Sequence, residues 1–97
     1  MSAYWVTCYR AVHDADKVAA YGRLAGPAIQ AAGGRFVTRG DAQAVFEAGQ
    51  LMRTVVIEFD SVDAAVAAYD SPDYAEALAA LGDGAERDIR IVPGVDG

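Results

Sequence analysis

Residues 53–74 read Arg-Thr-Val-Val-Ile-Glu-Phe-Asp-Ser-Val-Asp-Ala-Ala-Val-Ala-Ala-Tyr-Asp-Ser-Pro-Asp-Tyr, and this stretch decides the fold. Its first part is rich in β-branched and aromatic residues, which predicts a strand over Leu51–Phe59. Successive side chains of a strand point to opposite faces. One face therefore carries Val55, Ile57 and Phe59, and the other carries Thr54, Val56 and Glu58.

The second part of the stretch contains two helix starts. Asp60-Ser61 precedes an apolar stripe at helical spacing, which predicts a capped helix from Val62 to Tyr69. Ser71-Pro72 then places an N-cap before a proline at the first helical position, which indicates a second start. The continued stripe ends at Gly82-Asp83-Gly84. We interpret Ser71-Pro72 as a break in the helix and not as a domain boundary.

Working outward toward the N-terminus, Ala3–Val12 predicts a strand that is apolar on both faces and therefore covered on both. Asp14 is the expected N-cap of a helix that runs to about Ala32. Gly26-Pro27 interrupts this helix, and we expect a kink or a restart there. Gly33-Gly34 ends it.

The remaining segments complete a four-stranded pattern. Arg35–Arg39 predicts a strand, Gly40-Asp41 a bulge or a bend, and Ala42–Glu47 a return to strand structure before a hairpin turn at Ala48–Gln50. Arg87–Val92 predicts the last strand, and Pro93-Gly94 closes it.

The order β-α-β-β-α-β predicts one α+β domain over residues 1–97, with the ferredoxin-like arrangement. Its four-stranded antiparallel sheet has both helical segments on one face. The other face would then expose apolar residues such as Val56 to water. We therefore expect a homodimer in which two open sheet faces pack together.

Composition narrows the possible partners. The 97 residues include 14 acidic and 8 basic ones, for a net charge of −6, which argues against nucleic acid and anionic membranes as partners. The single cysteine, Cys8, fits a reducing compartment, and it is expected to be buried and inert. No apolar run approaches a membrane span and no signal peptide is evident. These features predict a cytoplasmic protein.

Few motifs point to chemistry. One histidine and one cysteine do not make a metal site, and neither a phosphate-binding loop nor a nucleophile elbow is present, so no metal and no cofactor are expected. Glu58 stands out as a carboxylate in an apolar strand. It could act as a general base or anchor a cationic group. The more ordinary interpretation is a structural ion pair with Arg39 or Arg53 on neighbouring strands.

His13 is the second catalytic candidate, because a histidine beside a carboxylate at a strand end can act as a general base near neutral pH. An exposed loop histidine is the more ordinary interpretation. Trp5 and Tyr69 are candidate pocket walls, although aromatic residues at such positions more often belong to the core.

Taken together and in order, these residues resemble the bacterial family called domain of unknown function 1330, in the dimeric α+β-barrel group of ferredoxin-like proteins. The resemblance covers nearly the whole chain and rests on Tyr4-Trp5, Asp14, Tyr21, Pro27, Gly33-Gly34-Arg35-Phe36, Arg39-Gly40, Glu47, Arg53, Val55–Phe59, Ser61, Ala65, Tyr69, Ser71-Pro72, Tyr74 and Gly94. The chain departs from the family pattern at Asp60, Asp41, Ala48 and Leu81. Leu81 replaces a common arginine and so removes one basic residue from any shared anion site.

The resemblance implies a dimer but no particular activity, because proteins with this barrel include cofactor-independent monooxygenases, isomerases and ligand binders. We expect a small-molecule enzyme or ligand-binding protein that acts without metal. Its ligand would lie in the cleft between sheet and helices or at the dimer seam, with Arg39, Arg53 and Glu58 as polar anchors and Trp5 and Tyr69 as walls. The alternative is a non-catalytic interaction or ligand-sensing protein, in which the same polar residues form structural ion pairs.

Overall fold

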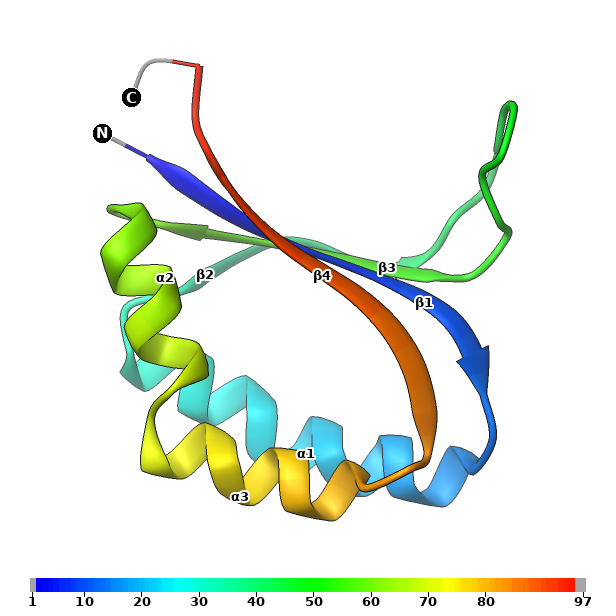
Figure 1. Cartoon of the computed structure of the whole chain (residues 1–97), viewed down its shortest axis with the longest axis horizontal. Helices are drawn as coiled ribbons and strands as arrows, with labels where there is room; N and C mark the ends of the chain where they lie inside the picture. Colours follow the sequence, from blue (N-terminus) through cyan, green and yellow to red (C-terminus); the bar gives the residue numbers. More distant parts are fainter. Residues whose placement is uncertain (1, 96–97) are drawn as a thin grey trace.

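The chain forms one antiparallel sheet with three helices on a single face (Figure 1). The computed structural model describes residues 2–95, so Met1, Asp96 and Gly97 of the predicted 1–97 domain lie outside it. The sheet order is β2-β3-β1-β4. The strands are β1 (Ala3–Val12), β2 (Arg35–Asp41), β3 (Arg53–Phe59) and β4 (Ala85–Pro93), and the helices are α1 (Ala15–Ala31), α2 (Val62–Tyr69) and α3 (Pro72–Leu81). The predicted ferredoxin-like α+β architecture is confirmed.

Each helix starts at the predicted cap. The Asp14 carboxylate accepts hydrogen bonds from the backbone N–H groups of Asp16 (3.0 Å) and Lys17 (3.2 Å). The hydroxyls of Ser61 and Ser71 each accept one N–H bond from the residue three positions later, at 3.0 and 3.2 Å. These bonds satisfy donors that a helix start leaves free. The helix α1 contains Pro27 without restarting.

The connection between β2 and β3 differs from the prediction. The strand β2 ends at Asp41 and β3 begins at Arg53, so residues 42–52 form an irregular arm instead of more strand. Figure 1 shows this arm projecting from the sheet on the side opposite the helices. The predicted strand at Ala42–Glu47 is wrong: within residues 2–95 the ladder ends at the Asp41–Arg53 pair, followed by one backbone hydrogen bond from Ala42 N–H to the Met52 carbonyl at 3.0 Å. Phe46 at its tip is 82% exposed.

A β-bulge in β2 lies earlier than predicted. The pairing of β2 with β3 shifts between Phe36 and Thr38, and not at Gly40-Asp41 as the sequence indicated. A bulge adds one residue to a strand and therefore changes which side chains share a face. Here Phe36 packs against the core, and Arg39, three residues later, also lies on the helix side of the sheet.

The core fills the space between the sheet and the helices. Trp5 is its centre, with ring centroids 5.2 Å from Tyr74 and 6.1 Å from Phe59. Val55, Ile57 and Phe59 lie on this covered face, as predicted. Gly34 lies just after the end of α1, where the chain packs tightly against the core. An added Cβ there would lie 2.6 Å from Ile29 Cγ2 and 2.8 Å from Phe59 Cζ.

The opposite sheet face has no covering layer within residues 2–95. It carries Tyr4, Val6, Val56 and Val92, all at least partly exposed. Cys8 lies on the same face and is exposed in the single chain, so its predicted burial is wrong for the isolated subunit. Among the helices of residues 2–95, none is long and apolar enough to cross a membrane.

Candidate functional site

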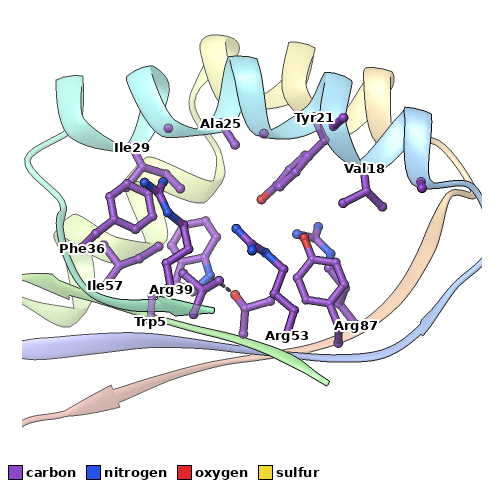
Figure 2. A pocket seen from close by; sticks show the side chains of 17 residues that line it. Trp5, Val18, Tyr21, Ala25, Ile29, Phe36, Arg39, Arg53, Ile57 and Arg87 are labelled. Atoms are coloured by element: carbon purple, nitrogen blue, oxygen red, sulfur yellow. Dashed lines mark hydrogen bonds between the residues drawn. The ribbon is translucent and has the colours of Figure 1, made fainter. Parts of the chain in front are cut away.

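A pocket of about 330 Å³ lies between α1 and the covered face of the sheet (Figure 2). All four strands supply its floor and α1 supplies its roof. The floor residues are Trp5, Thr7, Tyr9, Phe36, Arg39, Arg53, Val55, Ile57 and Arg87, and the roof residues are Ala15, Val18, Ala19, Tyr21, Gly22, Ala25, Gly26 and Ile29. The volume lies at the small end of the range for ligand pockets.

Three arginines from three strands reach into this pocket. Arg39 comes from β2, Arg53 from β3 and Arg87 from β4. Figure 2 shows their side chains rising from the sheet toward α1, with Arg53 in the middle of the view. The bulge in β2 is what puts Arg39 on this side, since without the extra residue Phe36 and Arg39 would face opposite ways.

Arg39 spans the gap between the sheet and the helix. Its guanidinium lies 4.4 Å from the centroid of the Phe36 ring, in a cation–π arrangement. A Cβ placed on Gly26 of α1 would lie 3.9 Å from Arg39 Nη1. The side chain thus forms part of one wall, with its charged end near the roof.

Arg87 is held by aromatic side chains. Its guanidinium lies 4.6 Å from the centroid of the Tyr21 ring and 5.6 Å from that of Tyr9. The Tyr21 hydroxyl is hydrogen-bonded to the Tyr74 hydroxyl at 2.7 Å. Burial raises the pKa of the Tyr74 phenol well above its usual range. The phenol is therefore neutral near pH 7 and supplies no counter-charge to Arg87.

Trp5 and Ile57 lie at the buried base of the pocket, where little of either side chain is exposed. Trp5 is 1% exposed, and its indole Nε1 donates a hydrogen bond to Thr7 Oγ1 at 2.8 Å. Trp5, which the sequence predicted as a pocket wall, is among the residues that line the pocket. Tyr69 packs on Trp5 at a centroid distance of 5.6 Å, but it does not line the pocket.

Glu58 lies outside this pocket. It is on the open face of β3, where the Arg35 Nε donates to Glu58 Oε1 at 3.3 Å and the Tyr4 hydroxyl lies 3.5 Å from Glu58 Oε2. The expected ion pair with Arg39 or Arg53 is wrong, because both of those arginines point to the covered face. Arg35 is the direct cross-strand partner of Glu58.

His13 also lies outside the pocket. Its side chain is more than half exposed, and its Nε2 lies 3.9 Å from Glu86 Oε2. This position agrees with the more ordinary interpretation of His13 as an exposed loop histidine. Among residues 2–95, no three histidine, cysteine, aspartate or glutamate side chains gather in one place.

A second hollow of about 370 Å³ lies on the open sheet face beneath the arm of residues 42–52. One side is formed by Val6, Cys8 and Thr54 of the sheet and the other by Val45 and Met52 of the arm. Asp88 and Arg90 border it and form an ion pair with each other at 2.9 Å. The hollow therefore belongs to the uncovered side of the sheet, away from α1.

Comparison with known families identifies the chain. Residues 2–95 match the family described as domain of unknown function (DUF1330), and the chain belongs to that family. No curated protein matches the sequence at a significant level.

Solved structures confirm the fold. A protein of unknown function from Rhodopseudomonas palustris is 20% identical, with a TM-score of 0.76 over 97% of this chain and 82% of the other. A dimeric ferredoxin-like protein of unknown function from Thermobifida fusca is 22% identical, with a TM-score of 0.66 over 97% and 92%. SnoaB, a cofactor-independent oxygenase from Streptomyces nogalater, is 18% identical, with a TM-score of 0.65 over 96% and 92%.

Sequence reasoning found Trp5, Arg39 and Arg53 but missed Arg87 and Tyr21 as pocket residues. A signal for Arg87 exists, since Ile89 and Ile91 follow at spacings of two and both pack against the core. Period-2 alternation therefore places Arg87 on the covered face. For Tyr21 the helical stripe pointed to the core, and the Tyr21 ring belongs to both the core and the pocket.

Proposed function

We propose that this protein binds a small molecule in the pocket between α1 and the sheet, as an enzyme or a ligand-binding protein, and that it works as a homodimer. The observation that supports the binding function is the pocket itself, which joins an apolar floor to polar groups from different strands. Pockets of this composition are where small ligands bind in proteins. Arg39, Arg53 and Trp5 are its predicted ligand contacts.

A library screen by thermal shift tests this function. Gly22 lines the pocket, and an added Cβ there would meet nothing within 4 Å, so Gly22→Leu extends a side chain into the open space. Gln30→Leu adds the same side chain to an exposed position of α1 outside the pocket. Ligands that stabilise the wild type should lose their effect in Gly22→Leu and keep it in Gln30→Leu. Equal responses in both variants would place binding elsewhere.

The homodimer is supported by the open sheet face. Tyr4, Val6, Val56 and Val92 form an apolar surface there, and the arm of residues 42–52 projects on the same side with Phe46 exposed. A surface of this kind is characteristic of an interface. The similar structure from Thermobifida fusca is described as dimeric.

Light scattering tests the dimer. The wild type should give twice the 10.2 kDa mass of the chain at micromolar concentration. Val56→Asp puts a charge on the open face and should give a monomer. Leu24→Asp puts the same charge on an exposed position of α1 and should leave the mass unchanged. A wild-type mass near 10.2 kDa would reject the proposal.

The second candidate is a non-catalytic interaction or ligand-sensing protein. The Arg35–Glu58 ion pair favours this candidate. Glu58 is the main catalytic candidate in the sequence, and an ion pair with Arg35 gives its carboxylate a structural role. Glu58→Gln distinguishes the two readings. If Glu58 is structural, the variant lowers stability modestly and leaves ligand-induced thermal shifts unchanged, whereas a role in binding would change those shifts.

A further inference from the structure

The charged residues that line the pocket are basic, although the chain as a whole is acidic. The sequence has 14 acidic and 8 basic residues, yet no aspartate or glutamate is among the residues that line the pocket and three arginines are. A random share of this acidic sequence would give the pocket more carboxylates than arginines. The local field is therefore positive inside a negatively charged molecule.

The three arginines also lack the carboxylate partners that four of the other five basic residues have. The fifth, Arg23, is exposed and forms no ion pair within residues 2–95. Lys17, Arg10, Arg35 and Arg90 each form an ion pair with a carboxylate. Within residues 2–95, Arg39, Arg53 and Arg87 form none. Arg53 and Arg87 are partly buried, and a partly buried guanidinium is usually stabilised by an anion, whereas Arg39 is exposed.

The lack of a carboxylate partner is clearest at Arg87. It is half-buried, and the groups around it are the aromatic rings of Tyr9 and Tyr21 and the neutral Tyr21–Tyr74 hydroxyl pair. These contacts hold the guanidinium in place and leave its charge unmatched. An anion entering the pocket would supply the missing charge.

The rest of the pocket indicates the body of the ligand. Phe36 and Val18 line the pocket and offer partly exposed apolar surface, whereas Trp5, Ile29 and Ile57 are at most 2% exposed and form packed layers behind it. The volume of about 330 Å³ is too small for a polymer. At Gly22 the roof has no side chain, and a Cβ there would meet open space. A ring system can therefore lie between the helix backbone and the sheet.

We infer that the pocket binds a small aromatic or alicyclic carboxylate, with the ring in the open space beneath Gly22 of α1 and the carboxylate held by Arg39, Arg53 and Arg87. This inference rests on the proposed function and gives it a ligand class. The planar guanidinium matches a carboxylate with two parallel hydrogen bonds, which favours a carboxylate over a neutral amide of the same shape.

Isothermal titration with two matched probes tests the inference. 2-Naphthoate and 2-naphthamide have the same ring and differ in charge. For the wild type at low salt, naphthoate should bind about tenfold more tightly or better, because charge-assisted hydrogen bonds are the stronger ones. Inorganic phosphate, which has no ring, should bind more weakly than naphthoate. Phosphate binding as tight as that of naphthoate would overturn the ligand class.

Three arginine variants locate the anion. Arg53→Met and Arg39→Met keep an aliphatic stem and should remove most of the preference for naphthoate over naphthamide. Arg23→Met is the matched control, because Arg23 is an exposed arginine of α1 that does not line the pocket. These variants avoid Arg87, whose aromatic contacts also support folding. An unchanged preference in both Arg53→Met and Arg39→Met would overturn the inference.

The outcomes separate this inference from the proposed function. If both probes bind equally and Gly22→Leu abolishes both, the pocket binds small molecules but the carboxylate inference is wrong. If neither probe binds and the library screen also has no hits sensitive to Gly22→Leu, both are wrong. Naphthoate preference that is lost in Arg53→Met and in Gly22→Leu supports both.

Discussion

Gly34→Ala should destabilise the protein strongly, because Gly34 lies where the end of α1 meets the sheet. An added Cβ would lie 2.6 Å from Ile29 Cγ2, 2.8 Å from Phe59 Cζ and 3.0 Å from Ile57 Cγ2. Ordinary carbon contacts are about 3.5–4.0 Å, so the neighbours would have to move by roughly 0.5–1.4 Å. All three are at most 2% exposed and cannot move into solvent.

The cost of such overpacking is about 1–3 kcal/mol, and three immobile neighbours place this case toward the upper end. For a domain of this size, 1 kcal/mol lowers Tm by roughly 4–8 °C. The single tryptophan, Trp5, is buried in the same core and reports unfolding by fluorescence in urea. Wild type and variant should be compared at equal protein concentration, because dimerisation would add to apparent stability.

Two glycines serve as controls. Gly40→Ala adds a Cβ that meets nothing within 4 Å and should cost little. Gly33 has φ of +96°, so Gly33→Ala should cost about 1–2 kcal/mol through backbone strain alone. If Gly34→Ala were no less stable than Gly40→Ala, the close approach of the chain at this point would be refuted.

Three further predictions concern the helix roof, the tyrosine pair and one surface carboxylate. Gly22→Ala should stabilise α1 by about 0.5–1 kcal/mol in urea unfolding, and a loss of stability would contradict the open space seen there. Tyr74→Phe should cost about 1–2 kcal/mol because it leaves the buried Tyr21 hydroxyl without its partner, and a double-mutant cycle with Tyr21→Phe should show coupling instead of additivity. Arg90 holds the pKa of Asp88 below its usual range, so the stability from this pair is present above the usual pKa of about 4 and is lost as pH falls through the lower folded value. A carboxyl NMR titration of Asp88 with a midpoint at or above the usual pKa would contradict the predicted lowering of the Asp88 pKa.

Local signals in the sequence were enough to predict most elements. The bounds of Ala3–Val12 and the break at Ser71-Pro72 follow from side chains that act within a few residues, namely β-branched residues in a strand and hydroxyls at helix caps. The element order then leaves few possible topologies. For this reason the fold and the open sheet face could be inferred before the structure.

Features that depend on pairing between distant strands could not be predicted. Whether residues 42–47 form a strand depends on a partner strand, and within residues 2–95 the pairing beyond Asp41–Arg53 continues only as the hydrogen bond from Ala42 N–H to the Met52 carbonyl. The partner of Glu58 depends on the register that places Arg35 beside it. A shift of one residue exchanges the two faces of a strand, which explains the error about the partner of Glu58.

The pocket was only partly predictable for the same reason. Arg39 and Arg53 were expected to act together with Glu58, but the bulge after Phe36 turns Arg39 to the covered face, while Glu58 faces the other way. The strand β4 is at the opposite edge of the sheet from β2, and its Arg87 lines the same pocket beneath α1 as Arg39 and Arg53. That three strands contribute arginines to one pocket is a property of the folded sheet.

The central claim is that Arg39, Arg53 and Arg87 bind one anionic ligand beneath α1. The most direct measurement follows the side-chain Nε–Hε NMR signals of the arginines while 2-naphthoate is added. The signals of Arg39, Arg53 and Arg87 should shift together and saturate at one common affinity, while the signal of Arg23 stays in place. Naphthoate binding that leaves these three signals unmoved, or that shifts Arg23 as much, would contradict the claim.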